Sequence, residues 1–375
     1  MAGLYIHVPF CLKRCTYCDF FSRTEMKYKT AYVEAVIREL ELRKDYLDGE
    51  SLETVYFGGG TPSQLQADDF KRIFETVHRY HNVVAGAEIT LEANPDDLTP
   101  AYLSALQPLS FNRISLGVQS FSDADLRMLH RRHNSRQAAD AVRRCREYGY
   151  DNLSIDLMYG IPGQTVEHWK KNLEAALRLN VPHLSAYHLS WEEGTTLYRQ
   201  WQSGVVCPVD EEISVQLYYT LLHILAAAGY LQYEISNFCK PGCFSRHNSS
   251  YWTGRKYLGV GPAAHSYNHH SRQWNMASLE EYFRGVRCGE TFFEKECLDL
   301  RTQYNDYVIT RLRTMWGIRL ADLRETFGAE LAGYFLRQAQ PHIRNGLLSV
   351  SDEIFRLTSR GAFISDGILS DLMRG

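Results

Sequence analysis

The chain has 375 residues, of which 45% are hydrophobic and 23% charged, a composition ordinary for a globular protein with one large domain and a smaller one. Its formal net charge of −3 gives no global attraction to nucleic acid, and no apolar run approaches the about 18 residues that a membrane span needs. His7 and Pro9 interrupt the short apolar N-terminal run, which does not have the form of a signal peptide. We therefore expect a cytoplasmic protein with no nucleic-acid partner and no membrane span, although peripheral contact with a membrane-bound partner stays open.

Short β-branched or aromatic runs alternate with longer helical patterns through the first two-thirds of the chain. The predicted strands are 4–8, 54–57, 87–92, 113–117, 152–158 and 183–188. The predicted helices between and after them are 28–47, 67–79, 100–107, 135–148 and 165–179. Strands that alternate with helices are typical of a parallel sheet with right-handed crossovers. Six such units predict an α/β fold, an incomplete (β/α)6 TIM-like barrel whose functional groups lie at the carboxyl ends of the strands.

The composition changes after a predicted helix at 210–228 and a strand-like run at 230–236. Residues 237–267 are rich in Gly, Pro, aromatic and basic residues, and the pattern is helical again from about Thr302. Two short apolar runs at 348–350 and 354–357 predict a hairpin. We therefore expect a barrel domain at 1–236, an irregular linking segment at 237–300 and a small helical, winged-helix-like domain at 301–375.

Three of the nine cysteines follow the first predicted strand within eight residues: Cys11, Cys15 and Cys18. A structural zinc site takes four ligands, and no fourth Cys or His lies nearby, so this spacing fits zinc poorly. Three thiolates can hold three irons of a [4Fe–4S] cluster and leave the fourth iron open for another ligand. Lys13 and Arg14 place positive charge beside the thiols, which we expect to lower their pKa.

The triplet Cys11-x3-Cys15-x2-Cys18 resembles that of the radical SAM superfamily, whose open iron takes the amino and carboxylate groups of S-adenosylmethionine (SAM). Gly58-Gly59-Gly60-Thr61-Pro62 and the polar ends of later strands resemble further landmarks of that family. Taken alone, the glycines would be a tight turn and the polar residues helix caps. The resemblance implies SAM contacts at Tyr5, Tyr17, Gly59, Gly60, Thr61, Glu92, Gln119, Arg131, Asp156 and Ser190. Arg131 would bind the SAM carboxylate, and Asp156 the ribose hydroxyls.

Within the superfamily, segments such as Asp156-Leu157-Met158-Tyr159-Gly160-Ile161-Pro162-Gly163 resemble the branch of the oxygen-independent coproporphyrinogen III oxidases, over nearly the full length. That branch also contains the HemW-type haem chaperones. The oxidases carry a fourth cysteine two positions after the third, where this chain has Phe20, and an N-terminal extension before the cluster motif. The chaperones carry His-Asn-x-x-Tyr-Trp, present here at 247–252. The resemblance therefore favours a HemW-type haem chaperone.

This resemblance implies haem b as a further cofactor and a haem-acceptor protein as partner. His247 would supply an axial nitrogen, and Tyr251, Trp252 and Tyr257 flat faces for the porphyrin. The cations nearest the motif in sequence, Arg246, Arg255 and Lys256, would meet the propionates. In the alternative interpretation, His247 only hydrogen-bonds a loop and the aromatic residues fill a domain interface.

Three functions stay open at this point. The first is a haem chaperone that passes haem to an acceptor, and the second is an oxygen-independent coproporphyrinogen III dehydrogenase. In the third, cluster and SAM serve only as a gate for haem transfer. No catalytic residue is assigned, His265 is a lower-ranked contact, and Cys239 and Cys243 have no functional account. The acceptor, productive SAM cleavage and the oligomeric state, including a homodimer that shares a haem, also stay open.

Overall fold

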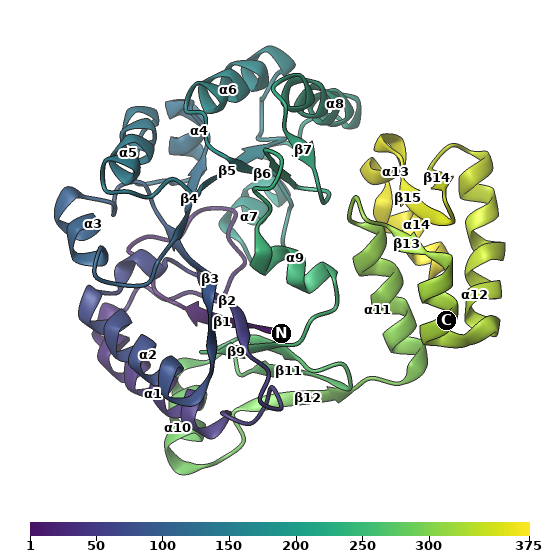
Figure 1. The fold of residues 1–375 in the computed structure, drawn as a ribbon. Coiled ribbons are helices and arrows are strands. Elements are labelled where there is room, and N and C mark those ends of the chain that lie inside the picture. Colours follow the sequence, from purple (N-terminus) through teal and green to yellow (C-terminus); the bar gives the residue numbers. More distant parts are fainter.

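The computed structural model describes all 375 residues as a large α/β barrel with a small domain beside it (Figure 1). Six parallel strands form the barrel wall: β1 (Ala2–Val8), β2 (Leu52–Gly59), β3 (Val83–Ala93), β4 (Arg113–Gln119), β5 (Leu153–Tyr159) and β6 (His183–His188). The helices outside or between them are α1 (Lys29–Leu42), α2 (Ala67–Tyr80), α3 (Pro100–Leu106), α4 (Asp123–Met128), α5 (Ser135–Glu147), α6 (Val166–Arg178), α7 (Thr196–Gln202) and α8 (Glu211–Ala227), with short 3-10 turns at Met26–Tyr28 and Pro62–Gln64. The six predicted strand–helix units are confirmed.

The barrel strands are buried on both faces, as expected for a parallel sheet covered by helices. Their outward side chains form one core of 58 buried residues with the helices. Their inward side chains are largely polar and lead up to the carboxyl ends of the strands. This division places the apolar packing outside the barrel and the chemistry inside it.

The prediction of an irregular segment at 237–300 is wrong. The segment contains β8 (Asn237–Cys239), α9 (Arg246–Trp252), β9 (Tyr257–Val260), β10 (His265–Tyr267), β11 (Ser271–Asn275), α10 (Leu279–Cys288) and β12 (Phe293–Cys297). These strands and β7 (Leu231–Gln232) extend the sheet at both edges, in the order β12-β11-β10-β9-β1-β2-β3-β4-β5-β6-β8-β7. Most have three to five residues, too few for an alternating pattern to stand out in the sequence.

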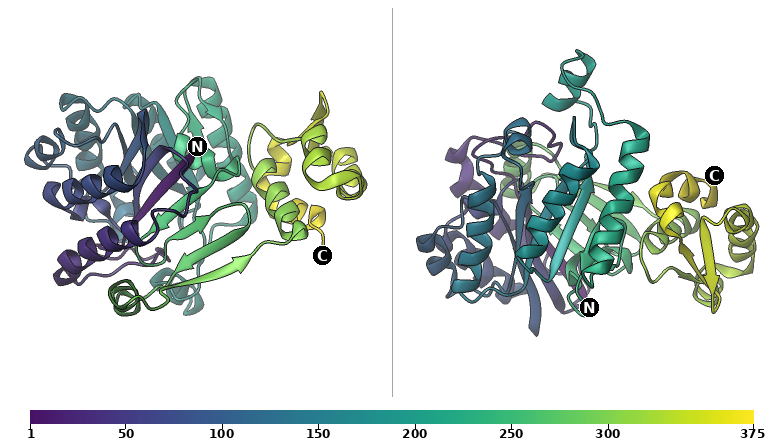
Figure 2. Two further views of the ribbon diagram at one scale, coloured as in Figure 1. Left: turned by 60° about the horizontal axis from the view of Figure 1, so that its bottom comes forward. Right: turned by 90° about the horizontal axis from the view of Figure 1, so that it is seen from above.

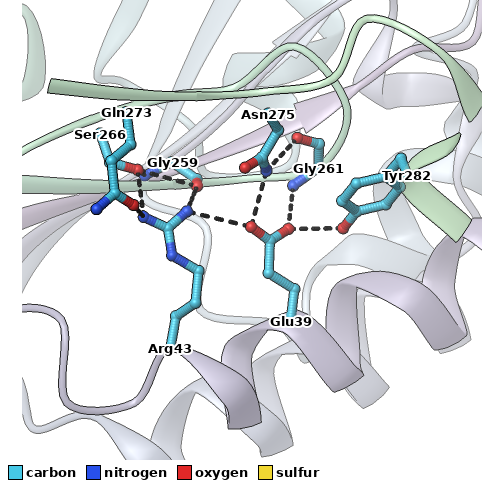
Figure 3. A network of polar contacts seen from close by, with 8 residues as sticks. All are labelled: Glu39, Arg43, Gly259, Gly261, Ser266, Gln273, Asn275 and Tyr282. Atoms are coloured by element: carbon cyan, nitrogen blue, oxygen red, sulfur yellow. Dashed lines mark hydrogen bonds and ion pairs between the residues drawn. The ribbon is translucent and has the colours of Figure 1, made fainter. Parts of the chain in front are cut away.

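A buried polar network holds the β9–β11 edge against α1 (Figure 3). Glu39 accepts hydrogen bonds from the Tyr282 hydroxyl at 2.6 Å and the Asn275 amide at 2.7 Å, and pairs with Arg43 at 3.2 Å. Arg43 donates in turn to the Gly259 carbonyl at 3.1 Å. Both charged side chains are buried, so the pair is sealed from water.

The C-terminal domain combines helices with a three-stranded antiparallel sheet, β13-β15-β14. Its elements are α11 (Leu300–Leu312), β13 (Ile318–Arg319), α12 (Leu320–Arg344, interrupted at Gly328), β14 (Leu348–Ser351), β15 (Ile354–Leu357), α13 (Ser359–Phe363) and α14 (Ser365–Leu372). The predicted hairpin is confirmed as β14–β15. The domain has its own core of 15 buried residues and contacts the barrel at Tyr233, whose carbonyl accepts from the Met315 amide at 3.0 Å. None of the helices combines the length and apolarity that crossing a membrane requires.

Candidate functional site

One cavity of about 400 Å³ opens at the carboxyl ends of the barrel strands. All three cysteines of the triplet and every predicted SAM contact except Tyr5 line it. The predicted residues brought together are Cys11, Cys15, Tyr17, Cys18, Gly59, Gly60, Thr61, Glu92, Gln119, Arg131, Asp156 and Ser190. Its volume lies in the range of small-molecule and cofactor sites.

The three thiols lie on the loop that follows β1. The Cys11 sulfur lies 3.2 Å from the Thr61 hydroxyl, and the Cys15 sulfur accepts a hydrogen bond from Arg131 Nη1 at 3.2 Å. The Leu197 amide of α7 donates to the Thr16 carbonyl at 2.8 Å, which fixes the middle of the loop. No three His, Cys, Asp or Glu side chains are close enough to bind one metal ion. In a [4Fe–4S] cluster each thiolate binds a different iron, whereas the ligands of a zinc ion all bind one metal. Thiols that share a cavity but are not close enough to bind one metal ion therefore fit the cluster better.

Neighbouring positive charge lowers the pKa of the Cys11 and Cys18 thiols, as expected, but burial outweighs it. Burial raises the pKa of the Cys18 thiol to about 11, and the charge of Arg14 offsets this only in part. Burial likewise raises the pKa of Cys11. These thiols would be deprotonated by iron itself, because a coordinating metal is the largest local charge.

Arg131 is a cation without an anionic partner. Its Nη2 donates to the Asn94 side-chain oxygen at 2.5 Å and to the Gly117 carbonyl at 2.6 Å, while its buried Nε has no partner. It takes part in none of the ion pairs, and the nearby carboxylates Asp96 and Asp97 pair with Arg132 instead. Gly117 permits this approach, because a Cβ there would lie 3.1 Å from the guanidinium. A fork-shaped cation facing a cavity fits a ligand carboxylate such as that of SAM.

The two predicted glycines bring bare backbone to the cavity wall. Gly59 has φ 107°, and a Cβ there would lie 2.6 Å from the His7 ring. A Cβ on Gly60 would lie 3.0 Å from the Val8 carbonyl oxygen. Side chains are therefore excluded from both positions, and the wall beside the cysteines stays open for a ligand.

Two partly buried carboxylates line the cavity, Glu92 on β3 and Asp156 on β5, with β4 between these strands. Burial raises the pKa of Glu92 to about 7 and that of Asp156 to about 6. Glu92 accepts hydrogen bonds from the Tyr56 hydroxyl at 2.6 Å and the Gly59 amide at 3.2 Å. Such acceptors suit the amino and hydroxyl groups of a bound SAM.

Tyr5 lies beneath the cavity rather than on its surface. Its ring would meet a Cβ on Gly58 at 2.9 Å, and its hydroxyl lies 3.2 Å from His7 Nδ1. Gln119 ends β4 in the left-handed region with φ 66° and lines the cavity. Lining residues absent from the predicted set include Asn94, Ser115, Met158 and Tyr187. Period-two spacing along the predicted strands would have found Met158, two residues after Asp156.

His247 lies outside this cavity, at the amino-terminal end of the barrel. Its side chain is 1% exposed and both ring nitrogens have partners: Thr54 Oγ1 at 2.8 Å and the Tyr251 hydroxyl at 2.7 Å. The ring stacks on Tyr56 with 4.8 Å between centroids. Glu88 accepts from the His247 backbone amide at 2.9 Å, which anchors the start of α9. Burial lowers the pKa of His247 to about 3.

The other predicted haem contacts are also occupied in this conformation. Trp252 lies at the domain interface with Arg313 above its ring, and Arg246 donates to the Gly86 carbonyl at 2.8 Å. Arg255 pairs with Glu53, and Lys256 with Asp48 and Glu50. In this conformation the motif is structural, as in the alternative interpretation, but His247 bonds strand β2 and its own helix rather than a loop. Haem ligation by His247 stays a prediction, and it would require α9 to leave the barrel.

Comparison with known proteins places this geometry in a family. A model described as the radical SAM superfamily matches residues 5–176, and one described as the HemN C-terminal domain matches residues 298–364. Over 99% of its length the chain is 32% identical to "Heme chaperone HemW" of Mycobacterium tuberculosis (strain H37Rv), covering 94% of that protein. It is 31% identical over 98% of its length to the protein of the same name from Bacillus subtilis, covering 98% of it. The chain belongs to the HemW family of radical SAM proteins.

A solved structure related to the HemW family member described here confirms the fold. Coproporphyrinogen III oxidase (HemN) from Escherichia coli, a radical SAM enzyme, superposes with a TM-score of 0.87 at 22% identity. The match covers 99% of this chain and 90% of the oxidase. The partial barrel with an added C-terminal domain is therefore confirmed, and this likeness extends to the fold alone.

Proposed function

We propose that this HemW family member is a haem chaperone that carries a [4Fe–4S] cluster with exchangeable SAM and passes haem b to an acceptor protein. The observation that carries the proposal is the cavity itself. It unites Cys11, Cys15 and Cys18 with an unpaired Arg131, and it has Phe20 where the oxidase branch has a fourth cysteine. The names of the family relatives support the haem-chaperone role.

The chain's own residues would divide the work of holding SAM. Arg131 would bind and orient the carboxylate, Gly59 and Gly60 would leave room for the methionine part, and Glu92 and Asp156 would accept N–H and O–H groups. Tyr17, Thr61, Gln119 and Ser190 complete the proposed lining. A bound cluster supplies the electron chemistry that radical SAM proteins use on SAM.

The barrel and the C-terminal domain would have different tasks. The barrel would hold cluster and SAM, and the C-terminal domain, with its own core, would help to dock the acceptor. A haem shared between two copies of the chain would make the chaperone a homodimer. Gel filtration with and without haem tests that last point.

The decisive experiment begins with anaerobic reconstitution of the full chain with iron and sulfide, followed by absorption spectroscopy with and without added haem. We expect cluster absorption that is lost in Cys11→Ala, Cys15→Ala and Cys18→Ala, and a Soret band from bound haem. Transfer is then measured to apomyoglobin, a haem acceptor with a known spectrum. A chain that binds a cluster but no haem would contradict the chaperone function.

The oxidase alternative and the gate are separated by two further measurements. Incubation with SAM, a reductant and coproporphyrinogen III is expected to give no protoporphyrinogen, and its formation would favour the dehydrogenase. Cysteine variants that bind haem but fail to pass it on would favour a cluster that gates transfer.

A further inference from the structure

The rim of the cluster cavity exposes large apolar side chains. Phe20, on the cysteine loop, is 62% exposed and lines the cavity, and its loop neighbour Leu12 is 56% exposed. Tyr187, at the end of β6, is 40% exposed and lines the same cavity. Exposed apolar side chains grouped at a cavity mouth mark a binding surface more often than scattered ones do.

The same loop carries unpaired positive charge. Lys13 and Arg14 are exposed, line the cavity and take part in none of the ion pairs of the chain. Arg14 only donates to the Cys18 carbonyl, at 3.3 Å. The one carboxylate on the loop is Asp19, so apart from the three cysteines the cations of the segment 11–20 outnumber its anions.

The opposite end of the barrel offers fewer accessible groups. There Arg255 and Lys256 are paired with carboxylates, and His247 is buried with both ring nitrogens bonded. The two ends are far apart: the purple cysteine loop lies at the upper end of the barrel and the N-terminus at the lower end (Figure 2, right). Arg246 is also exposed there without a carboxylate partner, but the aromatic residues of that end, Tyr251, Trp252 and Tyr257, are only partly exposed. The cysteine-loop end thus combines free cations with the more accessible aromatic faces.

We propose that haem docks across the mouth of the cluster cavity, with its porphyrin face on Phe20 and Tyr187 and its propionates at Lys13 and Arg14. A flat apolar molecule with two carboxylates is the ligand that this combination complements. The proposal rests on the haem-chaperone function above and gives that function a binding site. It places haem, SAM and cluster at one end of the barrel, while α9 stays seated at the other.

The test is a haem titration of anaerobically reconstituted full-length protein, followed through the Soret band. We expect Phe20→Ala to weaken haem binding about tenfold, because it removes an aromatic face, and Lys13→Gln/Arg14→Gln to weaken it about tenfold by removing both cations. Leu300→Ala, a comparably exposed apolar position on α11, is the matched control and should change affinity by less than twofold. Iron content and cluster absorption confirm that each variant is folded.

Haem dimethyl ester gives a second readout that misfolding would not mimic. The ester has no propionate charge, so it should bind the wild type about as weakly as haem binds the Lys13→Gln/Arg14→Gln variant. That variant should bind haem and its dimethyl ester with the same affinity. His247→Gln, which keeps a polar partner for Thr54 and Tyr251, separates this site from the haem ligation by His247 that the sequence predicts. With haem at the cavity mouth the variant should bind haem within twofold of the wild type, whereas ligation by His247 would make it lose haem.

Three results would overturn the site. Loss of haem in His247→Gln, with Phe20→Ala and the charge variant unaffected, would assign the haem to α9. Unchanged affinity with slower transfer in the rim variants would make the rim an acceptor-docking surface. If the wild-type protein binds no haem, the haem-chaperone function itself is contradicted. This result differs from the other two, which contradict only the site.

Discussion

At the scale of single residues, Glu92 joins the two polar ends of the barrel interior. Its carboxylate lines the SAM cavity and accepts from Tyr56, whose ring stacks on His247 at the far end. The carboxylate also faces Asp156, so burial and a like charge both favour its protonated form. The folded chain therefore holds on to a proton that the unfolded chain releases.

This proton makes the stability of the cluster-free protein depend on pH. The pKa of Glu92 is raised from its usual value near 4.5 to about 7, so the folded state binds the extra proton between these values. Stability should therefore fall as pH rises from about 5 to 7.5. We expect Glu92→Gln to flatten that fall. The free energy of unfolding of the variant minus that of the wild type should therefore be roughly 2–3 kcal/mol larger at pH 8 than at pH 5.

Urea unfolding of the two proteins at a series of pH values measures this difference. Glu174→Gln, an exposed position on α6, is the control and should leave the wild-type pH profile unchanged. Parallel profiles for Glu92→Gln and the wild type would show that Glu92 titrates normally.

At the scale of elements, α9 is a seven-residue helix fixed by its polar contacts. Glu88 accepts from the first amides, and His247 spans Thr54 and Tyr251. Thr253, the residue that directly follows the helix, accepts at its carbonyl a hydrogen bond of 3.1 Å from Arg311 of α11. The helix thus joins the base of the barrel to the C-terminal domain.

If α9 is seated this way, His247→Ala should destabilise the protein by about 2–4 kcal/mol, because two buried hydroxyls lose their partner and a cavity remains. Asn248→Ala should cost less than about 1 kcal/mol, because only the backbone amide of Asn248 is hydrogen-bonded. Both are compared by urea unfolding at neutral pH. Equal losses would mean that α9 is not held by His247.

The contrast between these elements shows what the sequence could predict. The polar residues at strand ends were predicted to meet because parallel strands bring their carboxyl ends to one edge, and twelve of the thirteen cluster and SAM positions do line one cavity. The position of α9 was not predictable, because its partners Thr54 and Glu88 are more than 150 residues away along the chain. The family resemblance of the motif at 247–252 predicts His247 as a haem ligand, and only the fold shows that both of its ring nitrogens are hydrogen-bonded in this conformation.

At the scale of the whole molecule, strands from later in the chain extend the partial barrel at its β1 edge. The β9–β11 edge lies beside β1, and the network of Figure 3 ties that edge to the end of α1. The cysteine loop also leaves β1, so the strand that positions the cluster is supported from this side. A buried ion pair adds little net stability, but the loss of one member leaves the other charge unpaired.

Arg43→Met should therefore cost about 3–5 kcal/mol, because Glu39 is fully buried and keeps only neutral donors. Burial raises the pKa of Glu39 although the charge of Arg43 opposes this, so removing Arg43 should raise that pKa further. The loss of stability in Arg43→Met should therefore grow as pH rises from 5 to 8. Glu39→Gln in the same background should remove that pH dependence.

Arg38→Met, whose pair with Glu41 is exposed, is the control on the same helix and should cost less than about 1 kcal/mol. Urea unfolding of the four proteins at both pH values measures these differences, and equal losses for Arg43→Met and Arg38→Met would show that the edge is held without the buried pair.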